Sequence, residues 1–512
     1  MIQKIKKKSL FKNTIYAFIV QIVNLLFSLF TSPYISKILG PDNLGRVNFS
    51  SAIVGWFTIF ALYGTATYGV RAIVKVKNDR QELSRTFKEI MLVKFYATII
   101  ALAAYIVMIF TVGKFRENML LYFVQGIILL TNLFSVDWLF QALEDYGYLA
   151  FRSVLVKILS VVGIFLFIKN SDDYIWYALI SVIAASFSNF FNIFYFTKKI
   201  DYKIKNLNVC RHFKGLSYFM GTTLLINVYT MLDQTLLGFM KTDADVAYMA
   251  RGRLFLNVGN AVMISIVNAF MPRVLASYSE NKNEYLHMLG FTKRIVLMFA
   301  MPIALGLFFL APYVMFLFGT DDFLNNATFA FQILCVSIPF SALGNWNYMQ
   351  RVTPSGLEKR GFFVVVGSAS LNCILNLIFI YFYGVTGAAF AYTITEIVSN
   401  TVWFIMMHKK DGFHIFKTDV FVYIIAGAVM FACMWGLSLL LSGYTWLNMV
   451  ILIVAAVIIY FLVLLLLRDK CLVFMIQKII CKNKRLKKSD EDESGDGKAD
   501  NNSKDFSDDK KE

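Results

Sequence analysis

Runs of about twenty apolar residues recur along almost the whole chain, and this is the length that a helix needs to cross the apolar core of a bilayer. Of the 512 residues, 58% are hydrophobic and 16% are charged. Soluble domains are roughly one quarter charged, so this chain has too little polar surface to enclose a core in water. The sequence therefore predicts an all-α polytopic membrane protein.

Dividing the apolar runs by this length gives about fourteen transmembrane helices. Their expected bounds are 14–36, 47–69, 89–111, 118–140, 150–168, 174–196, 215–239, 247–271, 292–317, 325–348, 361–382, 386–407, 419–441 and 446–467. The first run follows a basic segment, but it is too long for the apolar part of a signal peptide. We interpret it as the first spanning helix.

The connections between these helices differ in charge from one side to the other. In connections predicted to be external, the basic residues are only Lys37, Arg46, Lys114, Arg116, Lys169 and Lys241. The internal connections hold many more, as in 71–88 and 198–214. Because cytoplasmic loops are rich in Lys and Arg, we expect a multi-pass protein of the cytoplasmic (inner) membrane with both termini cytoplasmic. The net charge of +17 then indicates topology and not nucleic-acid binding.

Two similar segments indicate an internal repeat. KILGPDNLGRVNF (37–49) and LLGFMKTDADVAYMARGR (236–253) each combine Leu-Gly, a short acidic turn and an Arg. Six predicted helices separate them, an even number, so the expected symmetry is a parallel pseudo-twofold along the membrane normal. We predict six-helix bundles over 1–210 and 211–418, two extra helices with a juxtamembrane segment over 419–481, and a disordered charged tail over 482–512.

Polar residues follow one face of four predicted spans. The stripes contain Gln21, Asn24, Ser28 and Thr31 on the first span, Asn48 and Ser51 on the second, Thr223, Asn227 and Gln234 on the seventh, and Arg253, Asn257 and Asn260 on the eighth. Taken singly, each is explained at least as well by hydrogen bonding between packed helices. Four stripes on corresponding helices favour a water-filled cavity between the two halves.

Three charged residues are expected at membrane depth beside this cavity. Asp233 on the seventh helix can meet Arg251 and Arg253 on the eighth, because a short turn joins the two helices. A structural ion pair is one explanation. The other is a cationic site with one Arg left for an anionic substrate, since a guanidinium matches phosphate oxygens bidentately. Asp233, and Glu396 near the middle of the twelfth helix, are also candidates for coupling to a proton or ion, although Glu396 could equally be structural.

The sequence contains no motif for a metal, a nucleotide or a cofactor. The six cysteines form no CxxC pair, and the four histidines lie in or beside predicted inner loops without a second ligand at metal spacing. GxxxxGK[ST] is absent, which argues against ATP hydrolysis by this chain. We expect no catalytic residue, metal or cofactor.

Several segments resemble one family. SPYISKILGPDNLGRVNF and the following YGVR, SVDWLFQALEDYGYLAFRS, LDQTLLG, VAYMARGRLF and AFMPRVLASYSE are similar, in this order, to bacterial polysaccharide repeat-unit (Wzx-type) flippases. These belong to the superfamily of multidrug, oligosaccharidyl-lipid and polysaccharide exporters. The resemblance covers residues from 10 to about 467.

This resemblance implies a non-enzymatic flippase that moves an undecaprenyl-diphosphate-linked oligosaccharide from the inner to the outer leaflet by alternating access. Its partners would be that lipid, membrane lipids, and the polysaccharide polymerase and chain-length machinery of capsule, exopolysaccharide or O-antigen synthesis. Arg253 would meet the diphosphate, with Arg251 less supported because the family often has a small residue there. Arg46 lies in the first repeat segment, and Arg71 in YGVR either meets the headgroup or fixes topology.

Other functions remain open at this point. A multidrug antiporter shares the superfamily fold but usually has twelve helices, and a lipid II flippase has fourteen but a different N-terminal signature. A membrane polysaccharide polymerase would be an enzyme with a large external loop, whereas every predicted external loop here is short.

Overall fold

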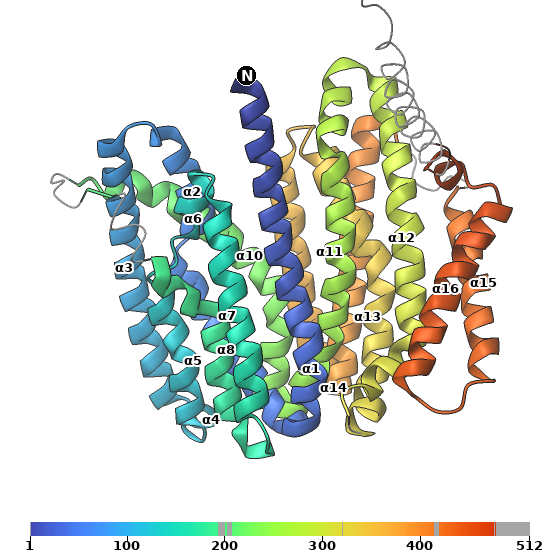
Figure 1. Ribbon diagram of the computed structural model, residues 1–512, viewed down its shortest axis with the longest axis horizontal. Coiled ribbons are helices and arrows are strands. Elements are labelled where there is room, and N and C mark those ends of the chain that lie inside the picture. The colour runs from blue at the N-terminus through green and yellow to red at the C-terminus, as the bar shows by residue number, and fades with distance from the viewer. Residues whose placement is uncertain are drawn as a thin grey trace, which may run out of the picture.

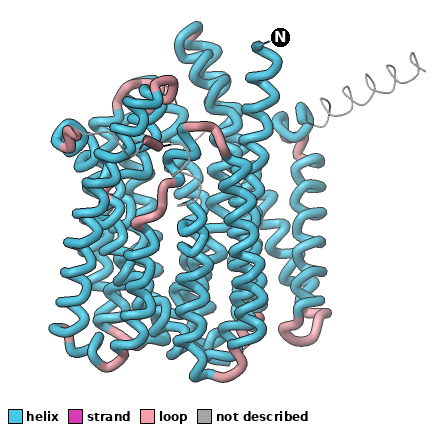
Figure 2. The backbone as a smooth tube through the Cα atoms, turned by 60° about the vertical axis from the view of Figure 1, so that its left-hand side comes forward, coloured by secondary structure: helices cyan, strands magenta, loops and turns pink. Residues whose placement is uncertain are grey.

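The computed structural model describes residues 2–192, 200–201, 207–319, 321–413, 419–475 and 477. Long helices run side by side through this part of the chain, which contains no β-strand (Figure 1, Figure 2). The predicted all-α class is therefore confirmed. The charged tail expected over 482–512 lies outside the described residues.

The described elements follow one another with short connections. They are α1 (Ile2–Leu62), α2 (Thr65–Val76), α3 (Arg80–Thr111), α4 (Gly113–Arg116), α5 (Met119–Asn132), α6 (Asp137–Ala142), α7 (Tyr146–Phe167), η1 (Ser171–Asp173), α8 (Tyr174–Ser186), η2 (Phe187–Phe190), α10 (Cys210–Met240), α11 (Asp243–Glu280), α12 (Lys282–Phe316), α13 (Asp321–Asn347), η3 (Tyr348–Val352), α14 (Glu358–Asp411), α15 (Asp419–Ser438) and α16 (Trp446–Leu466).

Two of these helices each contain a sharp bend at a glycine. Gly40 in α1 has φ 70° and ψ 173°, and Gly384 in α14 has φ 56° and ψ −132°. A positive φ is easily adopted only by glycine, so these residues turn the chain without a loop. The N-terminus and α2 consequently lie toward the same end of the molecule, with the turn of α1 at the other end (Figure 1).

Within the described residues, ten helical stretches are long and apolar enough to cross a membrane. The stretches containing Gly40 and Gly384 each comprise two helical arms, and α8 and α10 add two more helices. The structure is therefore compatible with fourteen spans. The number itself, the division at 210 and 418, and the pseudo-twofold stay predictions.

Neighbours in sequence form two groups of helices in space. Helices α1 to α8 pack mainly on one another, and α11 to α14 do the same; α1 also packs extensively on α11, and α10 contacts α14, α1 and α11. The pair α15 and α16 packs on α12 at the edge of the molecule (Figure 1). The cavity described below lies where α1 meets α10 and α11.

Apolar side chains lie on both the inside and the outside of the bundle. Trp346 and Tyr105 are buried between helices, whereas Ile100 and Phe151 are 71% and 70% exposed. Large apolar side chains facing outward on so many helices are what a lipid-facing surface requires. The protein is therefore a multi-pass membrane protein, as predicted.

Candidate functional site

A cavity of about 330 Å³ lies between helices that the polar stripes predicted to face it. Its polar lining comes from both arms of α1 and from α8, α10 and α11: Ser28, Thr31, Ser32, Asn48, Tyr177, Gln234, Arg251, Arg253 and Asn257. Phe27, Ala250 and Leu254 complete the wall. The structure thus brings Arg251, Arg253, Gln234 and Asn257 together at one site.

Local structure explains why these residues meet. The bend at Gly40 folds α1 back on itself, so Thr31 and Asn48 reach the same cavity from two arms. At the start of α11, Thr242 and Asp245 form a capping box that fixes where the helix begins. Ala250, Leu254 and Asn257 then follow one another at helical spacing on the cavity face.

Arg251 is a buried cation whose hydrogen-bonding capacity is only partly used. Its side chain is 7% exposed, its Nη1 donates to Ser32 Oγ, and Tyr177 also interacts with the guanidinium. Its Nε and Nη2 have no hydrogen-bond partner among the described residues. Neither Ser32 nor Tyr177 supplies a negative charge. An anion in the cavity would give these donors the partner that a buried charge requires.

Arg253 lies two residues further along α11 but is paired within the protein. Its Nε donates to Asp233 Oδ2 at 2.7 Å, and its guanidinium lies 4.7 Å from the centre of the Tyr392 ring. The Tyr392 hydroxyl in turn hydrogen-bonds with Glu396. A chain of contacts therefore joins the two predicted coupling residues, Asp233 and Glu396, across α10, α11 and α14.

Two of the predicted asparagines, Asn24 and Asn227, do not line the cavity. Asn24 is an exposed residue of α1, one turn before Ser28. Asn227 donates its Nδ2 hydrogen to Thr223 O on its own helix at 2.8 Å. Both belong to the polar stripes, but in this conformation their side chains lie outside the cavity wall.

Arg46 and Arg71 also lie away from the cavity, near opposite ends of the bundle. The Nε of Arg46 is 3.6 Å from Asp243 Oδ2, and Lys114 Nζ is 3.1 Å from Asp243 Oδ1. The guanidinium of Arg71 is 4.9 Å from the centre of the Phe219 ring. Arg46 therefore joins α1 to the start of α11, and Arg71 joins α2 to α10.

The backbone approaches very closely where Arg46 meets Asp243. A Cβ atom on Gly45 would overlap the backbone carbonyl of Asp243. Lys114 also donates to the carbonyl of Gly238 and lies 4.9 Å from the Phe49 ring centre. These contacts hold α1, α4, α10 and α11 together at the end opposite the N-terminus.

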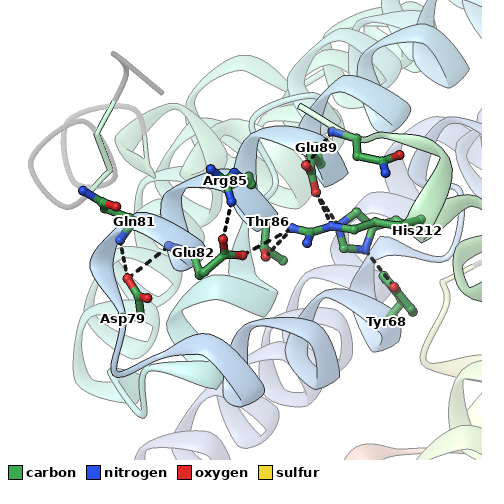
Figure 3. A network of polar contacts seen from close by, with 10 residues as sticks. Tyr68, Asp79, Gln81, Glu82, Arg85, Thr86, Glu89 and His212 are labelled. Carbon is green, nitrogen blue, oxygen red and sulfur yellow. Dashed lines mark hydrogen bonds and ion pairs between the residues drawn. The ribbon is translucent and has the colours of Figure 1, made fainter. Parts of the chain in front are cut away.

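At the other end, a polar network joins α10 to α2 and α3 (Figure 3). Glu89 on α3 is fully buried, and its carboxylate accepts from Asn208 N at 2.7 Å and from Arg211 Nε at 2.6 Å. His212 lies between Glu89 and Tyr68, with Nε2 2.8 Å from Glu89 and Nδ1 2.8 Å from the Tyr68 hydroxyl. We call Glu89, Arg211, His212 and Tyr68 the α3–α10 network.

The charge state of His212 follows from this geometry. Desolvation lowers the pKa of His212 below its ordinary value, and this outweighs the opposing effect of Glu89. A neutral imidazole has one donor and one acceptor, so Nε2–H donates to the carboxylate and Nδ1 accepts from Tyr68. The side chain thereby connects α2, α3 and α10.

Sequence reasoning missed this network and several other buried charges. Lys94, which lies within the predicted span 89–111, is buried and donates to Ser135 O at 2.5 Å. Arg351, which lies between the predicted spans 325–348 and 361–382, is buried and pairs with Asp411, with Nε 2.8 Å from Oδ2. The sequence shows that residues of opposite charge are present, but it does not show which of them pair. The fold is needed to identify the partner of each buried charge.

The described residues contain no group of three or more His, Cys, Asp and Glu that could hold a metal ion. The cavity offers charge and hydrogen bonding: two guanidinium groups, hydroxyls and amides. Such a set can bind an anionic, hydroxyl-rich ligand.

Comparison with known sequences identifies relatives of the chain. Residues 10–279, more than half of its length, match the family described as "Polysaccharide biosynthesis protein". A protein of Shigella dysenteriae described as "Putative O-antigen transporter" is 23% identical over 399 residues, covering 76% of this chain and 97% of the relative. A protein of Escherichia coli (strain K12) with the same description is 24% identical over 284 residues, covering 54% and 67%.

Solved structures share the fold at low sequence identity. The lipid II flippase MurJ in an inward closed conformation superposes with a TM-score of 0.70 at 16% identity, covering 90% of this chain and 99% of that one. A multidrug resistance MATE family transporter in an inward-facing conformation gives a TM-score of 0.60 at 14% identity, covering 77% and 94%. Both show that this chain shares their fold.

Proposed function

The chain belongs to the polysaccharide biosynthesis protein family, and on that premise we propose that it is a flippase for a lipid-linked oligosaccharide. It would move an undecaprenyl-diphosphate-linked repeat unit from the inner to the outer leaflet for capsule, exopolysaccharide or O-antigen synthesis. The O-antigen transporter descriptions of its relatives and its flippase-like fold support this proposal.

The main support for this proposal is the environment of Arg251 in the first cavity. A buried guanidinium with unused donors and no carboxylate partner among the described residues needs an anion. The diphosphate of a lipid-linked sugar supplies negative charge and oxygens that match the fork of arginine. The neighbouring Thr31, Asn48, Gln234 and Asn257 can hydrogen-bond with sugar hydroxyls. We assign the diphosphate to Arg251.

The chain of contacts around Arg253 would have a different role. Asp233 contacts Arg253, Arg253 lies against the Tyr392 ring, and Tyr392 hydrogen-bonds with Glu396. A proton or cation bound at either carboxylate would change the partners of Arg253, and α10, α11 and α14 would respond together. We therefore propose that Asp233 and Glu396 couple transport to an ion, while Arg253 transmits the change.

In this proposal the structure is a closed state of the transport cycle. Its volume of about 330 Å³ is near the lower limit for small-molecule pockets. An oligosaccharide needs more space, so the α1 and α11 walls must separate during transport. No covalent bond is made or broken in this step, and the polymerase and chain-length machinery would act afterwards at the outer face.

The test is complementation of a deletion strain of the source bacterium with the wild-type gene, Arg251→Gln or Arg360→Gln. Arg360 is an exposed arginine outside the cavity and serves as the matched control. We expect wild type and Arg360→Gln to restore surface polysaccharide. Arg251→Gln should reduce it by roughly tenfold to a hundredfold, because charge-assisted hydrogen bonds contribute about 1.5–3 kcal/mol.

The location of the lipid-linked repeat units decides between the remaining functions. Flipping predicts that they accumulate on the cytoplasmic leaflet of the deletion strain. Normal surface polymer with altered drug sensitivity would contradict the proposal and favour an antiporter. Unpolymerised units on the outer leaflet would indicate a step after flipping, and arrested peptidoglycan synthesis would indicate lipid II as substrate.

A further inference from the structure

A second cavity, of about 650 Å³, lies at the ends of α11 and α12 beside the segment 470–475 that follows α16. It shares no lining residue with the first cavity. It lies where the predicted eighth span ends, the ninth begins and the fourteenth ends. This cavity is therefore at the boundary between the membrane and water, on the side of the N-terminus (Figure 1).

The polar part of this cavity is cationic. Arg273 of α11, His287 and Arg294 of α12 and Lys470 line it, and none of the lining residues that the structure describes is Asp or Glu. Cys471 adds no negative charge, because burial raises the pKa of its thiol to about 12. The nearby Asp469 is buried and occupied: it accepts from Cys471 N at 3.0 Å and from the Tyr423 hydroxyl at 3.1 Å.

The remaining lining is apolar and aromatic. The Phe291 ring lies 5.9 Å from Phe270 and 5.7 Å from Phe474, and Phe474 itself is 45% exposed. A row of three rings beside three cations and a histidine matches a molecule with an anionic head and a hydrocarbon chain. Neither a free phosphate nor an uncharged lipid would use both parts of this lining.

We propose that this cavity binds an anionic phospholipid of the leaflet on the N-terminal side. Its phosphate would lie at Arg273, Arg294 and Lys470, and one acyl chain would lie along Phe270, Phe291 and Phe474. The cavity is lined by α11, α12 and the segment after α16, so a bound lipid would hold the end of α16 against α11 and α12. The inference does not depend on what the first cavity transports.

The experiment measures thermal unfolding of the purified full chain in detergent with added phosphatidylglycerol or phosphatidylcholine. We expect phosphatidylglycerol, and not phosphatidylcholine, to raise the melting temperature in a saturable manner. In the double variant Arg273→Gln, Lys470→Gln, half of the full increase should require roughly thirtyfold more phosphatidylglycerol, since two basic contacts are lost. Both residues are exposed, so the variant should fold without lipid.

The matched control removes two exposed basic residues elsewhere, Lys282→Gln and Arg360→Gln, and should respond as the wild type does. An equal response to phosphatidylcholine would overturn the proposal. So would an unchanged response of the Arg273→Gln, Lys470→Gln variant. A response to a polyprenyl diphosphate alone would assign the cavity to the transported lipid, which also contradicts it. The single variant Lys470→Gln should also require more phosphatidylglycerol than the wild type, but less than the double variant.

Discussion

Arg251 and Arg253 lie two residues apart on α11, yet their guanidinium groups have different partners. The sequence placed both beside a cavity and anticipated that one could pair with Asp233. Resemblance to the family gave more weight to Arg253 as the substrate ligand. The structure pairs Arg253 with Asp233 and leaves donors of Arg251 unused. The rotation of α11 about its axis, relative to α10, decides which arginine meets the carboxylate. The spacing of residues in the sequence does not determine this rotation.

At this scale we predict the effect of Asp233→Asn on stability. Asp233 is 1% and Arg253 is 6% exposed, so the variant leaves a buried cation without its anion. Loss of one partner of a buried pair costs roughly 3–5 kcal/mol. The melting temperature of the purified protein should fall clearly, and the protein should unfold at lower denaturant concentration.

The double variant Asp233→Asn, Arg253→Gln is the control for this prediction. Removing both charges leaves no unpaired ion, so it should regain more than half of the lost stability. If the double variant loses the sum of the two single losses, the pair contributes no coupling. Arg253 would then not depend on Asp233 for its stability in the folded protein.

Among the elements, α1 and α11 determine how the first cavity is closed at one end. Gly45 lets the second arm of α1 approach the backbone of Asp243, and Arg46 and Lys114 add charge pairs at the same place. The repeat segment that contains Gly45 was recognisable in the sequence. Its contact with the matching segment at 236–253 was not, because a helical repeat does not indicate which faces touch.

We predict that Gly45→Ala opens this end. Its Cβ would overlap the Asp243 carbonyl, and backbone cannot move aside as a flexible side chain does. Overpacking costs roughly 1–3 kcal/mol. In a background with Asn257→Cys in the cavity and no other cysteine, Gly45→Ala should increase labelling by a membrane-impermeant maleimide added to intact cells.

Gly367→Ala is the matched control for this measurement. Nothing lies within 4 Å of a Cβ at Gly367, and alanine there is favoured over glycine in a helix by roughly 0.5–1 kcal/mol. It should leave labelling of the cavity cysteine unchanged. Equal labelling in the Gly45→Ala and Gly367→Ala proteins would show that the contact does not close the cavity.

The α3–α10 network has a similar place at the other end of the bundle. The sequence does not single out Glu89 or His212, because the pattern along a helix indicates which face is exposed and not a partner over 100 residues away. In the fold Glu89 is fully buried, and a buried carboxylate needs hydrogen-bonding partners. Arg211 and His212 are those partners.

For the whole molecule, hydropathy predicted the class and the approximate positions of the helices because lipid imposes one length on every span. It did not predict where helices end outside the bilayer. Helix α11 runs to Glu280 and α12 begins at Lys282, beyond the expected bounds of 271 and 292. Capping by Asn281, which accepts from Asn283 N, and not apolar length, determines this boundary.

The same reasoning predicts orientation. The N-terminus and the basic connection between α2 and α3 lie at one end of the bundle, whereas α4 and the connection between α15 and α16 lie at the other (Figure 1). The positive-inside rule assigns the first end to the cytoplasm. We therefore expect Asn78 and Lys282 to face the cytoplasm and Glu117 and Ser442 to face outward.

Single cysteines at these four exposed positions test this orientation in an otherwise cysteine-free chain. A membrane-impermeant maleimide added to intact cells should label Glu117→Cys and Ser442→Cys, and should label Asn78→Cys and Lys282→Cys only after permeabilisation. Labelling of Lys282→Cys in intact cells would show that the protein has the opposite orientation. The anionic-lipid cavity would then face the outer leaflet, and the end closed by Gly45 would be the cytoplasmic one, so the direction of the proposed cycle depends on this result.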